Sequence, residues 1–195
     1  PEVSRSRAEL ETVDLRPFAE LIRGGVAPVI CTNHCHYPAL EPDRRVPATV
    51  SRKIVNGLLR EKLGFEGVII SDSLTMRAMK DNYGIEEGAI AAVAAGHDLI
   101  LQDYQSDPKI TVDAVARAVR QERIPLAQVE ASVRRVWRLK QSVGLLENRF
   151  VDAQKAQQCL TTPEHQALAR RIARESVTVL ENRGLPFGAG DDQRI

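Results

Sequence analysis

The stretch GFEGVIISDSLTMRAM, residues 64–79, decides how the rest of the chain is interpreted. A glycine and the apolar run 68–70 lead directly into Ser71, Asp72 and Ser73, and helix-forming residues follow at once. A short, continuous apolar run is typical of a buried parallel strand. Polar residues directly after such a strand lie at its carboxyl end, where parallel α/β folds place catalytic groups. The stretch therefore predicts that Asp72 presents a carboxylate at the mouth of a sheet.

The composition is that of an ordinary globular protein, with 195 residues, 43% of them hydrophobic, and a formal net charge of +1. A charge so close to zero gives no electrostatic basis for binding nucleic acid or an anionic membrane. An aromatic content of 4% also disfavours platforms for stacking bases. No apolar stretch approaches the roughly 20 residues that cross a bilayer. We therefore expect neither a nucleic-acid partner nor a membrane span.

The cysteine content bears on the cellular compartment. Cys31, Cys35 and Cys159 are odd in number and form no repeating framework, which argues against a disulfide scaffold. We expect them to be buried structural thiols, and a reducing, cytoplasmic compartment is favoured. No signal peptide is visible, but the sequence begins at Pro1, so an exported or lipid-anchored form stays open.

Apolar runs alternate with helical patterns along the chain. The runs 26–34, 67–71 and 98–102 predict strands. Helical patterns occupy residues 7–23, 51–63, 74–80, 85–96, 108–122 and 126–142. This alternation predicts parallel strands joined by right-handed crossovers, which is an α/β fold. A closed (β/α)8 barrel needs eight strands and roughly 250 residues, so the chain is interpreted as part of a barrel.

Several stretches of the sequence resemble a known protein family. The run LLREKLGFEGVIISDSLTMRAM, 58–79, resembles the nucleophile segment of the family 3 glycoside hydrolases. The likeness extends upstream to NHCHYPALEP and PATVSRKI, where His34, Tyr37 and Pro38 match the His-x-x-Tyr-Pro motif of the β-N-acetylhexosaminidase branch. The β-glucosidase branch usually has a different loop and a Trp shortly after the nucleophile, where this chain has Ser73-Leu74. Downstream, AAVAAGHDLIL resembles the family's last barrel strand.

The resemblance implies the domain organisation. Residues 1–143 would be the C-terminal part of a (β/α)8 TIM-type barrel, and 144–175 a linker with an outer helix. Residues 176–195 would begin a C-terminal α/β domain with an apolar strand from Val177. The first five barrel strands, a Lys-His segment that holds the sugar, and an Asp-His acid/base on a mobile loop would precede residue 1. The missing N-terminal half of the barrel, in the same or a separate chain, is thus an expected partner.

The resemblance also assigns chemistry to the polar residues. It implies that Asp72 is the nucleophile of a retaining exo-glycosidase that forms a covalent glycosyl-enzyme. The substrate would carry a terminal β-linked N-acetylglucosamine from peptidoglycan or chitin. His34 would line the sugar pocket or orient Asp72, and Met76 would contact the substrate. A β-glucosidase, a glycoside phosphorylase and a non-catalytic barrel fragment or subunit are the alternatives.

Structural interpretations remain open for each of these residues. Asp72 or Ser73 could cap the helix at 74–80, His34 could be satisfied by loop backbone, and Met76 could pack in the core.

The cluster Cys31, His34, Cys35 and His36 is a poor zinc site, because its ligands crowd into six residues and no second group of Cys and His residues lies nearby. We expect no metal and no organic cofactor.

Two further expectations concern structure alone. Asp98 opens the predicted strand 98–102, which places it at the bottom of the barrel, where residues serve stability. Trp137, with Val133 and Val136, is expected on the buried face of its helix. The solvated face of the same helix is expected to carry the neighbouring basic residues Arg134, Arg135, Arg138 and Lys140.

Overall fold

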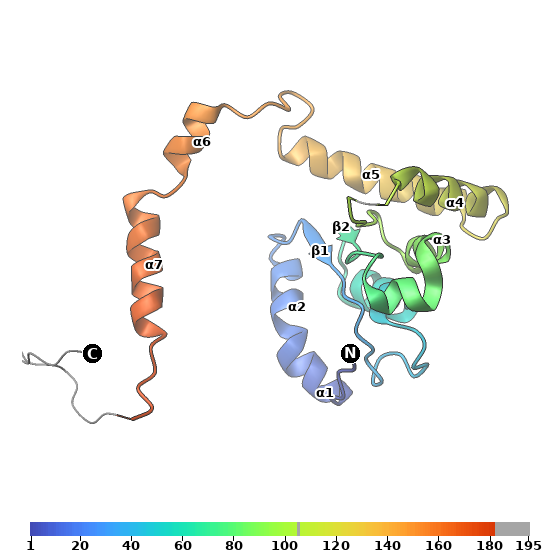
Figure 1. The fold of residues 1–195 in the computed structure, drawn as a ribbon, viewed down its shortest axis with the longest axis horizontal. Coiled ribbons are helices and arrows are strands. Elements are labelled where there is room, and N and C mark those ends of the chain that lie inside the picture. The colour runs from blue at the N-terminus through green and yellow to red at the C-terminus, as the bar shows by residue number, and fades with distance from the viewer. Residues whose placement is uncertain (105, 182–195) are drawn as a thin grey trace, which may run out of the picture. The chain divides into compact units, whose positions relative to one another are not determined.

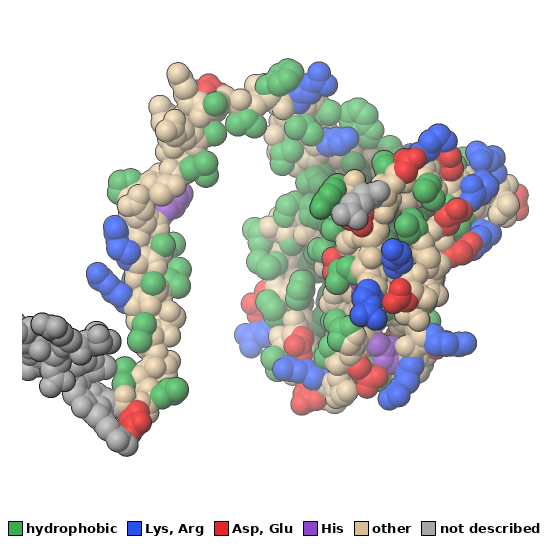
Figure 2. Space-filling model, in the orientation of Figure 1, with side chains coloured by type: hydrophobic (Ala, Val, Ile, Leu, Met, Phe, Trp, Pro, Cys, Tyr) green, Lys and Arg blue, Asp and Glu red, His purple; other side chains and the backbone are tan. Residues whose placement is uncertain are grey.

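The computed structural model describes residues 1–104 and 106–181. The chain divides into two compact units, Pro1–Glu147 and Asn148–Ile195. Figure 2 shows basic and acidic side chains interspersed over the surface of the first unit, in keeping with the net charge of +1. Among the described residues, no helix is both long and apolar enough to cross a membrane.

The first unit opens with a helical segment where the sequence predicts one. Helix α1 (Arg7–Glu9), a π-helical turn (Leu10–Asp14) and α2 (Arg16–Arg23) follow one another without a long break. A capping box starts the segment. The Ser6 hydroxyl accepts from the Glu9 N–H, and the Glu9 carboxylate accepts from the Ser6 N–H at 2.8 Å. Gly24 caps the end of α2.

The centre of the unit is a parallel strand pair. Strand β1 (Val29–Cys31) pairs with β2 (Val68–Ile70), with Val29 opposite Val68 and Cys31 opposite Ile70. The crossover between them contains the 3-10 turn η2 (Ala48–Val50) and the π-helix η3 (Lys53–Lys62) (Figure 1). The Ser51 hydroxyl accepts from the Ile54 N–H at 3.3 Å, as expected of a capping residue. The parallel α/β arrangement predicted from the sequence is confirmed for this pair.

The third strand, predicted over residues 98–102, does not form at its full length. Residues 98–102 form only one parallel bridge, between Leu99 and Ile70. The segment nevertheless runs along β2, because the Ser71 N–H donates to the Leu99 carbonyl at 3.0 Å and the Leu74 N–H donates to the Leu101 carbonyl at 3.1 Å. The Leu101 N–H donates to the Ser71 hydroxyl instead of to a backbone carbonyl, so the regular ladder ends there.

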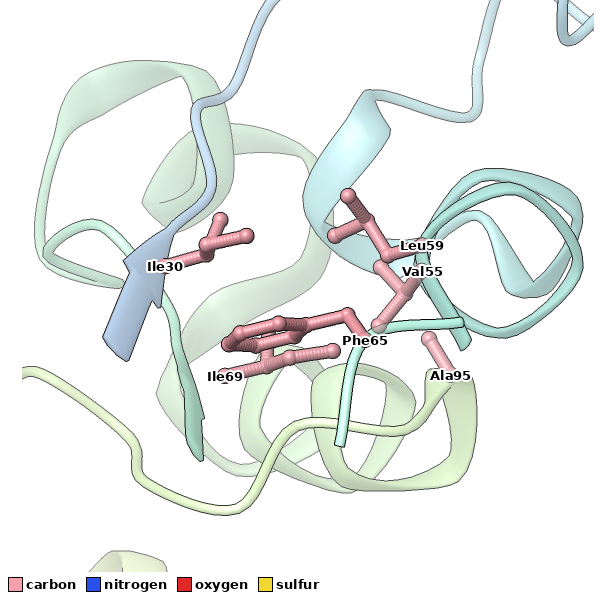
Figure 3. Packing of buried hydrophobic residues seen from close by; sticks show 6 residues of the cluster. All are labelled: Ile30, Val55, Leu59, Phe65, Ile69 and Ala95. Atoms are coloured by element: carbon pink, nitrogen blue, oxygen red, sulfur yellow. The ribbon is translucent and has the colours of Figure 1, made fainter. Parts of the chain in front are cut away.

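The largest apolar cluster packs the strand pair against the crossover helix (Figure 3). Ile30 comes from β1 and Ile69 from β2, while Val55 and Leu59 come from η3. Phe65 and Ala95 complete the cluster. Gly67 allows this close packing, because a Cβ there would lie 2.5 Å from the Pro28 carbonyl oxygen.

Three helices follow β2. Helix α3 (Arg77–Ala95) is interrupted at Gly84, whose φ of +68° separates the two helices that the sequence predicts. The first of them begins at Arg77, three residues later than predicted. Helices α4 (Pro108–Arg120) and α5 (Leu126–Ser142) lie within the predicted ranges. A second apolar cluster joins α3 to α4 and includes Ile90, Ala114, Ala118 and Ile124.

Asp98 is a buried charge that ties four segments together. Its carboxylate has no exposed surface, and it accepts from the Ile69 N–H of β2 at 2.9 Å. Arg60 of η3 lies 2.5 Å away and Arg135 of α5 lies 2.8 Å away. Burial lowers the pKa of the Arg60 guanidinium, and the Asp98 charge opposes that effect. The structural role expected for Asp98 is therefore supported by its contacts.

Helix α5 departs from the expected burial pattern. Trp137 is 54% exposed and Val133 is 49% exposed, so the expectation of a buried face was wrong. Arg135 was also misassigned to the solvated face, because it turns inward to pair with Asp98. The ion pair with Asp98 thus links the Arg135 side of α5 to β2.

The second unit contains two helices. Helices α6 (Ala153–Cys159) and α7 (Pro163–Glu175) both lie in residues 144–175, where a linker with one outer helix was predicted. The apolar residues Leu168 and Ile172 of α7 are about half exposed, and Figure 2 shows hydrophobic side chains along this unit. No strand forms over 177–181, so the predicted strand is wrong there, and its continuation lies outside the described residues.

We expect Asp98→Asn to lower the free energy of unfolding by about 3 to 5 kcal/mol, because it leaves two partly buried guanidinium groups without their counter-charge. Urea unfolding of the protein that carries this chain measures the effect. Asp113→Asn is the control, since Asp113 forms an exposed pair with Lys109 and its loss should change little. Equal stabilities of the two variants would contradict the role of Asp98.

Candidate active site

The floor of the site is formed where three segments end side by side. The Thr32 N–H, just after β1, donates to the Ile70 carbonyl of β2 at 3.0 Å. The Ser71 N–H donates to Leu99 in turn, so the carboxyl ends of β1, β2 and the segment 98–101 meet at one edge. Asp72 follows directly after this edge. The structure thus places Asp72 where the sequence predicts it, at the mouth of the strands.

Asp72 is half-buried and does not cap the following helix. Its Oδ1 accepts from the Ser73 N–H at 2.7 Å, within the turn that precedes α3. The cap residue of α3 is Met76, and no side chain caps that helix end. The Ser73 hydroxyl instead lies 2.8 Å from the Thr75 hydroxyl. The capping interpretation of Asp72 and Ser73 is therefore wrong.

His34 is buried, with 6% of its surface exposed, and it reaches the turn that carries Asp72. Its Nε2 lies 2.9 Å from the Ser73 carbonyl oxygen, and its Nδ1 lies 2.7 Å from the Thr49 hydroxyl. His34 also lines a cleft of about 610 Å³ together with Arg45 and Tyr83, and Asp72 is not among the residues that line this cleft. The loop-backbone alternative holds in part, because Ser73 contributes a backbone oxygen. The structure brings His34 to the residue next to Asp72, and its functional role stays a prediction.

Met76 is 49% exposed at the mouth of the strands, so the alternative of core packing is wrong. Met79, fully buried, fills the core instead. The Met76 N–H donates to the Ser73 carbonyl at 3.1 Å, the same oxygen that faces His34. A contact between Met76 and substrate stays a prediction.

The cysteine expectation needs correction. Cys31 and Cys159 are exposed and Cys35 is half-buried, because Cys31 stands at the open carboxyl end of β1 and Cys159 ends an exposed helix. Partial burial raises the pKa of the Cys31 thiol, and the charge of Asp72 raises it further.

The two loop histidines are engaged by protein groups. His36 Nε2 lies 2.8 Å from the Glu41 carbonyl oxygen and its Nδ1 lies 3.4 Å from a Glu2 oxygen, while His34 contacts Ser73 and Thr49. Within residues 1–104 and 106–181, no group of three or more His, Cys, Asp and Glu side chains is placed to hold a metal ion.

The buried His97 and the half-buried Thr32 form a hydrogen-bonded pair that the sequence patterns did not predict. His97 is 1% exposed; its Nδ1–H donates to the Ala92 carbonyl at 3.0 Å, and its Nε2 accepts from the Thr32 hydroxyl at 2.9 Å. Burial lowers the pKa of His97 to about 4, so the ring is neutral. Thr49 and Ser71 were missed as well. The available signal was a histidine shortly after the apolar run 89–95 and directly before Asp98.

Comparison with known proteins identifies the family. Residues 1–139 match the profile described as "Glycosyl hydrolase family 3 N terminal domain". The chain belongs to glycosyl hydrolase family 3. A solved structure of a family 3 beta-N-acetylglucosaminidase from Paenibacillus sp. superposes with a TM-score of 0.82 at 38% identity, covering 94% of this chain and 35% of that one. The family resemblance drawn from residues 58–79 is confirmed.

Two curated relatives agree with this placement. Beta-hexosaminidase A from Pseudoalteromonas piscicida is 28% identical over 201 residues, which cover 95% of this chain and 33% of that protein. A protein named beta-N-acetylglucosaminidase/beta-glucosidase from Cellulomonas fimi is 32% identical, over 84% of this chain and 30% of its own length. The chain spans about a third of each relative. Its first unit is a portion of the TIM-type α/β barrel of the family, as predicted.

The buried His97 predicts a pH-dependent stability. Its pKa is about 4 in the folded protein and 6.5 ordinarily, so the unfolded chain takes up this proton first as the pH falls. The contribution of His97 is complete above about pH 6.5 and is lost towards pH 4, by about 3 kcal/mol in all. Urea unfolding at a series of pH values measures the slope. His97→Gln removes the titrating group and should flatten this slope, whereas identical slopes would contradict the assignment.

Proposed function

We propose that the protein carrying this chain is a retaining exo-β-N-acetylhexosaminidase with Asp72 as its nucleophile. The observation that carries the proposal is the position of Asp72, directly after β2 at the edge where three segments end. The family membership supports a glycoside as substrate. The relatives named for β-N-acetylglucosaminidase and β-hexosaminidase activity favour an N-acetylated sugar. Peptidoglycan or chitin fragments are the proposed sources of that sugar.

The chemistry follows from a carboxylate in this position. A carboxylate oxygen of Asp72 attacks the anomeric carbon, the glycosidic C–O bond breaks, and the leaving oxygen takes a proton from an acid. Water then attacks the anomeric carbon of the glycosyl-enzyme and gives its proton to the same group, which releases the sugar and Asp72. We expect the acid/base from another part of the barrel, since the chain spans about a third of its relatives.

The residues around Asp72 suit its proposed role. The Ser73 N–H holds one oxygen of the half-buried Asp72 carboxylate at 2.7 Å, which orients the group. The Nε2 of His34 and the backbone N–H of Met76 both contact the Ser73 carbonyl oxygen, and these contacts hold the turn that follows Asp72. We propose that His34 positions the turn and that Met76, exposed at the mouth, contacts the substrate. Both roles rest on geometry around Asp72.

The loop after β1 is organised by its own side chains. The Asn33 amide donates to the Tyr37 hydroxyl at 2.9 Å, and its oxygen accepts from the Cys35 N–H at 2.9 Å. These bonds give the His34–Tyr37–Pro38 motif a defined conformation beside the site. The motif is the sequence feature that favours the N-acetylhexosaminidase branch.

A β-glucosidase is the second candidate, because the Cellulomonas fimi relative is named for both activities. Hydrolysis rates on aryl β-N-acetylglucosaminide and aryl β-glucoside, measured side by side and with added phosphate, separate the two hydrolases from a phosphorylase. Our proposal predicts a higher kcat/KM on the N-acetylated substrate and no stimulation by phosphate. Preference for the glucoside, or a requirement for phosphate, would contradict it.

We expect Asp72→Asn to lower kcat on aryl β-N-acetylglucosaminide by at least about 10³-fold, because the amide cannot form the glycosyl-enzyme. Glu66→Gln is the matched control, since Glu66 is exposed in the same stretch and should leave kcat unchanged. Both variants should unfold at the wild-type urea concentration. Full activity of Asp72→Asn would rule out the proposed nucleophile.

A further inference from the structure

Thr49 is a fully buried hydroxyl next to His34, and sequence patterns gave it no role. It lies in the 3-10 turn Ala48–Val50, with 0% of its surface exposed. Its hydroxyl donates to the Asn33 carbonyl at 2.8 Å and lies 2.7 Å from His34 Nδ1. A buried hydroxyl with two such short contacts is fixed in place, so it can fix its neighbours in turn.

The hydrogen-bond directions at His34 depend on this hydroxyl. The Ser73 carbonyl can only accept, so the Nε2 that faces it must carry a hydrogen. Thr49 satisfies Nδ1 in both charge states of the ring. When Nδ1 is protonated, the hydroxyl accepts from it and donates to Asn33. When the ring is neutral with its hydrogen on Nε2, the single hydroxyl hydrogen turns from the Asn33 carbonyl to Nδ1. In each case the Nε2–H stays directed at Ser73.

Loss of the hydroxyl would remove this control. The buried Nδ1 of His34 would then have no partner at this position, and only the Ser73 carbonyl would hold the ring in the orientation that directs its Nε2–H at the turn. Ser73 directly follows Asp72, and its N–H holds the Asp72 carboxylate at 2.7 Å. The turn that presents the carboxylate would therefore be held less firmly by His34.

We infer that Thr49 is a positioning residue for glycoside cleavage, acting through His34 on the turn that carries Asp72. This inference rests on the function proposed above. The backbone supports the assignment, because the Ala48 N–H donates to the Cys35 carbonyl at 2.9 Å and holds the 3-10 turn independently of the hydroxyl. Removing only the hydroxyl should thus leave the turn in place.

The test compares Thr49→Val, which keeps the shape and loses the hydroxyl, with Thr49→Ser, which keeps the hydroxyl. Steady-state hydrolysis of aryl β-N-acetylglucosaminide by the full protein should show kcat about 10- to 100-fold lower for Thr49→Val, with KM changed less than about threefold. Thr49→Ser should restore kcat to within about threefold of wild type. A purely structural role would not produce this split or this rescue.

A double-mutant cycle tests whether Thr49 acts through His34. In a His34→Ala background, Thr49→Val should cost less than about twofold in kcat, because its target is gone. Thr49→Ala replaces Thr49→Val if the latter does not fold with a wild-type thermal midpoint. Wild-type kcat for Thr49→Val, no rescue by serine, or full additivity in the cycle would overturn the inference.

The result also separates this inference from the proposed function. If the wild type cleaves the substrate and Asp72→Asn does not, then the Thr49 variants alone decide the role of Thr49. A wild-type protein that cleaves no glycoside overturns both.

Discussion

The buried carboxylate of Asp98 is the constraint on which the arrangement of the first unit depends. It binds Arg60 of the crossover helix, Arg135 of α5 and the backbone of β2 at Ile69, so it holds β2 to both helices and to the start of the 98–101 segment. Asp72 follows Ile69 by three residues, roughly 10 Å along a strand. Because β1 and β2 pair in parallel, their carboxyl ends lie at the same edge as Asp72. Buried ion pairs are poor sources of net stability, and this one acts by specifying an arrangement.

The sequence predicted the features that depend on local pattern. The apolar run 68–70, followed at once by Asp72, was sufficient to place a carboxylate at a strand end, and the alternation of elements gave the parallel α/β class. It failed where the outcome depends on distant partners. Arg135 was assigned to solvent because its ion pair is with Asp98, and Trp137 was assigned to the core although it is exposed. The strand over 98–102 shrank to one bridge because Ser71 takes the next N–H through its side chain.

In the site too, the sequence predicted the residues that follow a local pattern and missed those whose partners are distant in the chain. Asp72 and His34 were found from their positions after strands and from a family motif. Thr49, Ser71 and His97 were not found, because a buried hydroxyl or imidazole gains its partners only from tertiary contacts. Their bonds nevertheless determine how the site is built. Thr49 bonds His34, Ser71 joins β2 to the 98–101 segment, and His97 accepts from Thr32 below the edge. These hydrogen bonds thus support one half-buried carboxylate.

The most direct test of the central claim is to trap the glycosyl-enzyme. An N-acetylglucosaminyl donor with a ring fluorine at C5 slows both chemical steps, and a good leaving group restores the first, so the covalent intermediate accumulates. Trypsin would then release residues 63–77, which contain both Glu66 and Asp72. Our account predicts one added sugar on this peptide, with fragmentation placing it on Asp72. Turnover without any adduct, or an adduct on Glu66 or on another peptide, would contradict it.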